Sequence, residues 1–268
     1  MRVSFVKMHG LGNDFVVLDA RAEAPPPMTS AIAKALADRN TGIGCDQLIL
    51  LEPSTAADFA MRIFNSDGGE VEACGNAARA VALLHAAPAR VETSAGIIGL
   101  QPAGAGATVD MGQPRFEWDA IPLDHPADTA EMPVGWDDLE RPFAVNVGNP
   151  HAVFFVDDAD AVDLERLGPE IEHDPLFPER VNVNVASVHG GAIRLRVWER
   201  GAGLTRACGT GACATAVAAI RRKLATSPVQ VDLPGGRLEI AWEGSGSILM
   251  TGPAAESFRG SFEWDDFA

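Results

Sequence analysis

LRVWERGAGLTRACGTGACATAVAAI, residues 195 to 220, contains the pattern that decides the fold. Alternating apolar residues over Leu195–Trp198 predict a strand, the glycines that follow predict a loop, and the alanine-rich run from Ala212 predicts a closely packed helix. Cys208 lies where this helix should begin. The first turn of a helix has free N–H groups and the positive end of the helix dipole, which favours a thiolate. We therefore expect a lowered pKa for Cys208 and a carboxylate-binding site beside it.

A second copy of this pattern occurs 134 residues earlier in the chain. The stretch MRIFNSDGGEVEACGNAARAVALL, residues 61 to 84, also predicts a strand, a glycine-containing loop and a small-residue helix. Arg62 precedes Cys74 by twelve positions, and Arg196 precedes Cys208 by the same number. A repeat of this length predicts two similar domains, each with one cysteine at a helix N-terminus.

Strands outnumber helices in both halves, and one small-residue helix per half fits best inside a curved sheet. We expect an α+β fold with two pseudo-symmetric lobes, each a curved, mostly antiparallel β-sheet or barrel around a central helix, with a cleft between them. Residues 1–113 should form the N-terminal lobe and 114–258 the C-terminal lobe. The tail, 259–268, should return to the first lobe as one more strand, and the proline-rich passage 114–142 should be an irregular crossing.

Composition excludes several classes of protein. The chain has 268 residues, is 47 % hydrophobic and carries a formal net charge of −16, which disfavours nucleic-acid and anionic-membrane partners. The N-terminus has no sustained apolar run, so neither a signal peptide nor a membrane span is expected. Four cysteines in a chain without secretory features suggest reduced thiols and a cytoplasmic location.

Two thiols on opposite sides of a cleft suit a reaction that inverts a carbon. One thiolate would remove the α-proton of an amino acid, and the other thiol would protonate the opposite face. A Cys–His hydrolase with His9, His85 or His151 as base is the alternative, but it leaves one cysteine unit unexplained. Cys45 and Cys213 have no counterparts and are expected to be buried structural residues. The cysteine spacings disfavour a zinc site.

The chain resembles the diaminopimelate epimerase family in motifs that run in family order from Lys7 to about Cys213: HGLGNDFVVLD, RNTGIGCDQ, IFNSDG, ACGN, VGNPHAVFFV, VNVNV and ERGAGLTRACGTGACA. The resemblance implies an isomerase that converts LL-2,6-diaminopimelate to the meso isomer, in lysine and peptidoglycan-precursor biosynthesis. It also implies that no pyridoxal phosphate, metal or other cofactor is used. It suggests a homodimer that binds a small-molecule substrate and neither nucleic acid nor membrane.

The resemblance also implies roles for individual residues. Cys74 and Cys208 would be the acid–base thiols, Glu199 would face the substrate ammonium, and His151 would support catalysis. The reacting carboxylate would be held by Gly75, Asn76, Gly209 and Thr210. The distal amino-carboxylate end would be recognised by Asn13, Gln47, Asn65, Asn149, Asn182 and Arg200, since asparagine amides both donate and accept and arginine forms a fork for carboxylates.

Four positions depart from the family pattern: Ala77 and Ala80 in CGNAARA, Cys45, and Asn184 in the VNVNV segment. We expect these departures to affect packing more than chemistry. Proline racemases and hydroxyproline epimerases also resemble the chain, but they have histidine at the position of Asn76. Phenazine-type isomerases lack the paired cysteines.

Two other readings stay open. A binding protein that keeps the fold without turnover would not need two reactive thiols, so thiol trapping at Cys74 and Cys208 would distinguish it. Opposed thiols also suggest reversible inactivation through a Cys74–Cys208 disulfide. Retention of full activity after that disulfide forms would contradict this hypothesis.

Overall fold

The computed structural model describes residues 1–23, 25–71 and 74–267. The chain divides into two compact units: unit 1 comprises Met1–Val109 with Gly252–Ala268, and unit 2 comprises Asp110–Thr251. These limits differ from the expected 113 and 258 because the last strand of unit 2 continues directly into the returning chain. In the described residues, no helix is long and apolar enough to span a membrane.

Unit 1 is built from strands around two helices. Its strands are β1 (Arg2–Gly10), β2 (Asn13–Asp19), β3 (Gln47–Glu52), β4 (Phe59–Asn65), β5 (Glu70–Val71), β6 (Ala89–Thr93), β7 (Gly96–Ala103) and β8 (Gly106–Asp110). Helix α1 (Ser30–Ala37) connects β2 to β3, and helix α2 (Gly75–His85) connects β5 to β6. Thr29 caps α1 by accepting the N–H of Ile32, as its sequence position suggests.

Unit 2 repeats this order. Its strands are β11 (Phe143–Asn146), β12 (Pro150–Phe155), β13 (Asn182–His189), β14 (Ala192–Glu199), β15 (Gly203–Thr205), β16 (Val229–Leu233), β17 (Gly236–Ala241) and β18 (Leu249–Pro253). Helix α3 (Leu164–Glu172) connects β12 to β13, and helix α4 (Gly209–Arg221) connects β15 to β16. A short hairpin, β9 (Gly135–Trp136) and β10 (Leu139–Glu140), and a 3₁₀ turn, η1 (Ala159–Ala161), are additions to the repeat.

Strand pairing is the same in the two units. β1/β2, β3/β4, β4/β5, β6/β7 and β7/β8 are antiparallel, whereas β2/β3 and β4/β6 are parallel. The corresponding pairs from β11 to β18 have the same directions. Each parallel pair is joined through a helix, as parallel strands require. The α+β class, with mostly antiparallel sheets in two pseudo-equivalent units, is confirmed.

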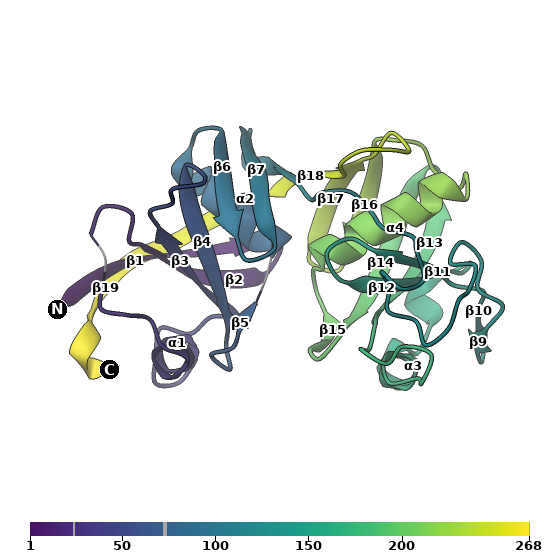
Figure 1. Ribbon diagram of the computed structural model, residues 1–268, viewed down its shortest axis with the longest axis horizontal. Coiled ribbons are helices and arrows are strands. Elements are labelled where there is room, and N and C mark those ends of the chain that lie inside the picture. The colour runs from purple at the N-terminus through teal and green to yellow at the C-terminus, as the bar shows by residue number, and fades with distance from the viewer. Residues whose placement is uncertain (24, 72–73, 268) are drawn as a thin grey trace. The chain divides into compact units, whose positions relative to one another are not determined.

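Helix α4 lies inside the curved sheet of unit 2 (Figure 1), where it contacts β11, β12, β13, β14, β16 and β17. Its residues from Gly211 to Ala219 are all buried, and most of them are alanine, glycine or threonine. A helix that is buried all round needs apolar side chains on every face, and small side chains let the strands approach closely. This arrangement positions the first turn of α4, and with it Cys208.

The chain ends in unit 1. Strand β19 (Ala255–Glu263) runs antiparallel to β1, from Ala255 opposite His9 to Glu263 opposite Arg2, and a 3₁₀ turn, η2 (Trp264–Asp266), follows. Figure 1 shows this yellow strand beside the purple N-terminal strand. The strand begins four residues before the expected tail, which started at 259. It makes both chain ends part of one sheet.

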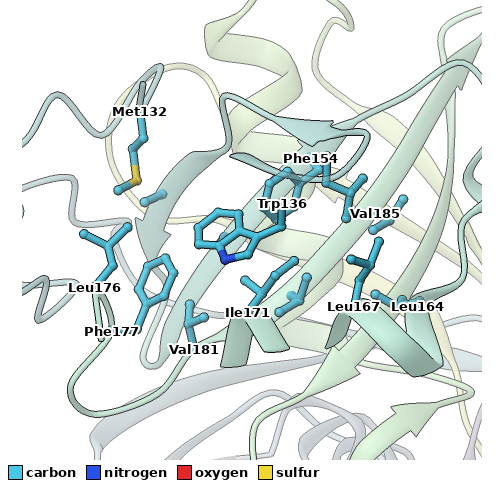
Figure 2. Packing of buried hydrophobic residues seen from close by; sticks show 14 of the residues in the cluster. Met132, Trp136, Phe154, Leu164, Leu167, Ile171, Leu176, Phe177, Val181 and Val185 are labelled. Atoms are coloured by element: carbon cyan, nitrogen blue, oxygen red, sulfur yellow. The ribbon is translucent and has the colours of Figure 1, made fainter. Parts of the chain in front are cut away.

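A second core of unit 2 lies between α3 and the sheet (Figure 2), where Trp136, Phe154, Ile171 and Phe177 pack together. The passage 114–142 contributes to this core through five buried apolar residues: Ile121, Leu123, Met132, Trp136 and Leu139. Apart from the β9–β10 hairpin the passage is irregular, as expected, but it is a packed part of unit 2 and not only a connection between the units. Its prolines and aspartates suggested a linker, but its few apolar residues bury their surface in unit 2.

Candidate functional site

In unit 1, Cys74 is the N-cap of helix α2. Its backbone is extended, with φ −145° and ψ 109°, and its Sγ accepts the N–H of Ala77 at 3.5 Å. Serine, threonine and aspartate oxygens usually make this contact with a first-turn N–H. The cysteine therefore places its sulfur, which is half-buried, against the N-terminus of the helix.

In unit 2, Cys208 has the same position at the start of α4. Its φ is −117° and its ψ is 108°, and its Sγ accepts the N–H of Gly211 at 3.3 Å. Each sulfur thus caps the third residue of its helix. The cysteine side chain at this second site is 3 % exposed. The matched register of the two cysteines in the sequence corresponds to matched local geometry in each unit.

The first two residues of each helix carry further backbone N–H groups of the same helix end. They are Gly75 and Asn76 in α2, and Gly209 and Thr210 in α4. Such N–H groups precede the first intrahelical donor, and they point out of the helix end together with its dipole. Each helix N-terminus therefore has the geometry of an anion site beside a thiol.

Side-chain amides of unit 1 form hydrogen bonds with one another, and one of them, Asn13, lies against Cys74. The Oδ1 of Asn13 lies 3.8 Å from the Sγ of Cys74 and accepts the Nδ2 of Asn76 at 3.2 Å. Gln47 and Asn65 are opposite each other on β3 and β4, and the Nε2 of Gln47 donates to the Oδ1 of Asn65 at 3.0 Å. The Oε1 of Gln47 is buried and has no hydrogen-bond donor among the described residues. A ligand N–H group would satisfy it.

The environment of Cys208 differs from the sequence-based expectation. Burial and the nearby Glu199 carboxylate raise the pKa of the Cys208 thiol well above its ordinary value, and hydrogen bonds from Thr210 and the Gly211 N–H only partly offset this. Burial also raises the pKa of Glu199, which accepts hydrogen bonds from Thr205 and from the thiol. The expected lowering of the Cys208 pKa is therefore wrong, because lost solvation and a neighbouring acid outweigh the hydrogen bonds that the sulfur accepts at the helix N-terminus.

His151 is a neutral, fully buried imidazole. Burial lowers its pKa to about 3, and the positive charge of Arg200 acts in the same direction. Its Nε2 lies 2.8 Å from the Oδ1 of Asn149, and its Nδ1 lies 3.2 Å from the Nδ2 of Asn184. Its Nδ1 also lies 3.3 Å from the Oδ1 of Asn184, so only the contact with Asn149, whose Oδ1 accepts, assigns the proton of the neutral imidazole to Nε2. His151 thereby fixes the amide of Asn149, one of the predicted substrate-binding residues.

Asn184 belongs to this network, although the sequence suggested only a change in packing. Its Nδ2 also lies 3.3 Å from the carbonyl oxygen of Gly211 and from the Oγ1 of Thr215, both on α4. The departure at Asn184 therefore involves hydrogen bonds inside unit 2, and the expectation that it affects packing more than chemistry stays a prediction. A signal was present in the sequence, because Asn182 and Asn184 are two residues apart and share one face of a strand.

Asn182 and Arg200 are also close together. Asn182 is 2 % exposed; its Nδ2 donates to the carbonyl of Pro150 at 2.7 Å and its Oδ1 accepts the backbone N–H of Arg200 at 3.0 Å. The guanidinium of Arg200 is exposed and donates to the carbonyl of Glu179 at 3.1 Å. The amide of Asn182 is thus engaged by the backbone, whereas the side chain of Arg200 is accessible.

The two remaining cysteines are buried, as expected. Cys45 is 1 % exposed and Cys213 is fully buried, and all four cysteines are free thiols. Burial raises the pKa of Cys45 to about 11. Neither residue belongs to a helix cap.

Comparison with known proteins identifies the family. The sequence profile described as diaminopimelate epimerase matches residues 5–117 and 143–256. The chain belongs to the diaminopimelate epimerase family. It is 70 % identical to the diaminopimelate epimerase of Erythrobacter litoralis over the full length of both chains. It is 65 % identical to that of Sphingopyxis alaskensis, over 98 % of each chain.

Solved structures at low identity share the fold. A hydroxyproline epimerase from Agrobacterium vitis matches with a TM-score of 0.68 at 17 % identity, over 97 % of this chain and 92 % of that one. A phenazine biosynthesis protein of the PhzF family from Bacillus anthracis matches with a TM-score of 0.69 at 15 % identity, over 98 % and 99 %. At these identities the likeness concerns the fold alone, and the resemblance to the diaminopimelate epimerase family comes from sequence.

Proposed function

We propose that this chain is an amino-acid epimerase that converts LL-2,6-diaminopimelate to meso-diaminopimelate, in lysine and peptidoglycan-precursor biosynthesis. Family membership over nearly the whole chain supports the reaction. The observation that carries the mechanism is the repeated cap: in each unit a cysteine sulfur accepts the N–H of the third helical residue, next to N–H groups suited to a carboxylate.

The two thiols act as an acid–base pair. One thiolate removes the α-proton, and the other thiol returns a proton to the opposite face of the same carbon, which inverts its configuration. The proton removed stays on the first sulfur, so the second sulfur ends as thiolate and the pair has exchanged roles. Because its surroundings favour the protonated form, Cys208 carries a proton in the free chain that it can donate.

The carboxylate of the reacting centre gains charge as the proton leaves. N–H groups of Gly75, Asn76, Gly209 and Thr210 stabilise that charge, since preorganised donors act most strongly where water is excluded. No pyridoxal phosphate or metal has a part in this mechanism.

Glu199 and His151 support the thiols in different ways. Glu199 accepts a hydrogen bond from the Cys208 thiol, so it orients that sulfur, and its charge also suits the substrate ammonium. His151 is a neutral donor that holds Asn149, and it acts on the reaction through that amide.

The distal amino-carboxylate end binds to the amides and to Arg200. The exposed guanidinium of Arg200 suits the distal carboxylate. The unsatisfied Oε1 of Gln47, with Asn65 and Asn13 nearby in the same unit, suits the distal ammonium. Asn182 acts by supporting the backbone of Arg200.

Incubation of the reduced, purified protein with LL-diaminopimelate in D₂O, without added cofactor, tests the function. We expect the meso isomer by chiral chromatography and one solvent deuterium at the inverted α-carbon by mass spectrometry. Absence of both product and exchange from folded protein would contradict the proposal, and proline-like substrates would then be tested.

Cysteine variants test the mechanism. Cys74→Ala or Cys208→Ala should lower epimerisation by at least about 10²–10⁴-fold, since each removes a positioned acid–base group. Cys213→Ala is the matched control, because it removes a thiol from the same helix α4 without touching a cap, and it should keep most of the activity. A comparable loss of epimerisation activity in Cys213→Ala, without unfolding, would show that the loss in the other two variants does not depend on the position of their cysteines at a helix N-terminus.

A cytoplasmic homodimer completes the proposal. The resemblance to the family supports it, and light scattering of the purified protein at several concentrations tests the oligomeric state.

A further inference from the structure

A continuous chain of polar side chains in unit 1 includes two charged residues to which no role has been given. Arg79, on α2, is fully buried and donates to the Oδ1 of Asn76 at 2.9 Å. Asn76 donates from Nδ2 to the Oδ1 of Asn13 at 3.2 Å, and Asn13 donates from Nδ2 to the Oδ2 of Asp46 at 3.0 Å. Asp46 lies in the RNTGIGCDQ segment, next to Gln47.

Both ends of this chain have fixed hydrogen-bonding character. A guanidinium only donates, so Asn76 must turn its oxygen toward Arg79 and its NH₂ group toward Asn13. A carboxylate only accepts, so Asn13 must turn its NH₂ group toward Asp46. The two ends independently require the same orientation of the Asn13 amide, with its oxygen on the side of Asn76 and Cys74.

Asp46 is itself held in place by its neighbours. Its Oδ1 accepts the Nη2 of Arg39 at 2.7 Å, and its Oδ2 accepts the backbone N–H of Asp14 at 3.1 Å. Arg39 also binds the carboxylate of Asp14 at 2.6 Å, and Lys7 pairs with that carboxylate from the other side. These charge-assisted contacts hold the acceptor for Asn13 in place.

The orientation of the Asn13 amide determines whether its oxygen or its NH₂ group faces the Sγ of Cys74. The Oδ1 of Asn13 is 3.8 Å from the Sγ, so a thiol can donate to it, whereas a thiolate would face the oxygen lone pairs. The N–H of Ala77 favours the thiolate from the other side. A hydrogen-bond acceptor next to an acid favours its protonated form.

We propose that Arg79 and Asp46 are positioning residues, which through Asn76 and Asn13 hold a carbonyl oxygen against Cys74 and favour its thiol form in the free chain. The thiolate that removes the α-proton therefore forms only when Cys74 loses this proton to solvent as substrate binds. The inference rests on the proposed function, in which Cys74 is an acid–base group. It gives a role to the arginine and the aspartate that bind the two asparagines next to Cys74.

The test measures Cys74 in the full-length protein without substrate. Alkylation by iodoacetamide is followed at Cys74 by peptide mass spectrometry, and thiolate is followed by its ultraviolet absorbance. Asp46→Asn replaces the carboxylate, which only accepts, by an amide that can also donate, so the Asn13 amide is then held only through Asn76 and turns more readily. A fall of about one unit in the pKa raises the thiolate fraction roughly tenfold and the alkylation rate about threefold, because nucleophilicity falls with the pKa.

Two further variants separate the hydrogen bond from charge. Asp14→Asn removes an equal charge next to Asn13, with the same partner Arg39, but leaves the Asp46 carboxylate as the acceptor of the Asn13 amide, so it should accelerate alkylation much less than Asp46→Asn does. Asn13→Asp keeps the shape and adds an acceptor, so it should slow alkylation. Circular dichroism checks that each variant is folded, and repetition at raised salt screens charge effects between exposed groups.

An acceleration that is equal in Asp46→Asn and Asp14→Asn, or no change in Asp46→Asn, would overturn the inference. Turnover of LL-diaminopimelate by the unaltered protein is measured separately. If the unaltered protein shows no turnover but the variants show the expected changes in Cys74 alkylation, the proposed function alone is contradicted. If turnover is normal but the variants alkylate at the rate of the unaltered protein, the positioning role alone is contradicted.

Discussion

The buried imidazole of His151 couples the stability of the chain to pH. Its pKa is about 3 in the folded chain and about 6.5 when it is exposed, so between these values only the unfolded chain binds the proton. The free energy of unfolding should therefore fall as pH falls below 6.5, by about 2 kcal/mol between pH 7 and pH 5, and His151 should contribute no slope above pH 7.

Urea unfolding at pH 7 and pH 5 measures this difference. His151→Gln should be less stable at both pH values but should lose about 2 kcal/mol of the pH dependence. His189→Gln is the control, because His189 is exposed and its removal should leave the dependence intact. Equal pH dependence in the unaltered chain and in His151→Gln would contradict the prediction.

At the residue level, the sequence predicted where the cysteines lie in the helices better than it predicted which groups surround their side chains. Glycines after each cysteine and the repeated spacing were sufficient to place Cys74 and Cys208 at helix N-termini. The pKa of Cys208 could not be predicted from local sequence, because it depends on burial by distant strands and on Glu199. Likewise, Arg79 and Asp46 lie in motifs that were identified, but only tertiary contacts show that their side chains converge on Asn13 and Asn76.

Helix α3 depends on the absence of a side chain at Gly168. A Cβ there would lie 2.4 Å from the Cγ of Trp198 on β14, so the helix and the strand are in direct contact. Alanine usually stabilises a helix by up to about 1 kcal/mol relative to glycine. Here overpacking should dominate, and Gly168→Ala should destabilise the chain by roughly 1–3 kcal/mol.

Denaturant unfolding followed by tryptophan fluorescence measures this effect. Displacement of Trp198 should also change the native emission, because its indole N–H donates to Glu172 at 2.7 Å. Glu165→Ala, at an exposed position of the same helix, should leave both the stability and the emission nearly unchanged. A Gly168→Ala chain as stable as the unaltered one would show that the helix can shift without cost.

Element types were largely predictable, and element limits were less so. Alternating apolar residues predict a strand because each strand has one buried face, as in β14, which contains the expected Leu195–Trp198. Short strands such as β5 and β15 were missed because two or three residues carry no periodic signal. The core contribution of 114–142 was missed because its apolar residues are spaced irregularly and become a core only against α3 and the sheet.

For the whole molecule, the sequence repeat predicted two equivalent folding units, and the strand directions of the two units agree pair by pair. The repeat gave no information about β19, which has no counterpart in unit 2. Its pairing with β1 is long-range, between residues about 250 positions apart, and local patterns do not determine such pairings. Unit 1 therefore needs both ends of the chain, whereas unit 2 is formed from one continuous segment.

This difference leads to a prediction about unfolding. Removal of residues 255–268 should expose the edge of β1 and the ring of Phe5, which contacts Phe258 and Phe262, and it removes the buried Trp264. Loss of a buried aromatic side chain alone costs about 3–5 kcal/mol. Unit 1 should then unfold at a lower denaturant concentration than unit 2.

Two probes distinguish the units in the truncated chain. Of the five tryptophans, Trp264 belongs to unit 1 and the other four belong to unit 2, so after truncation fluorescence reports unit 2 alone, while circular dichroism reports both. The circular dichroism transition should begin before the fluorescence transition, which is the signature of unfolding in more than two states. Trp264→Phe in the full-length chain has the same tryptophans but keeps β19, so its two transitions should lie closer together. Coincident transitions in the truncated chain would mean that unit 1 does not depend on β19, or that the two units unfold as one.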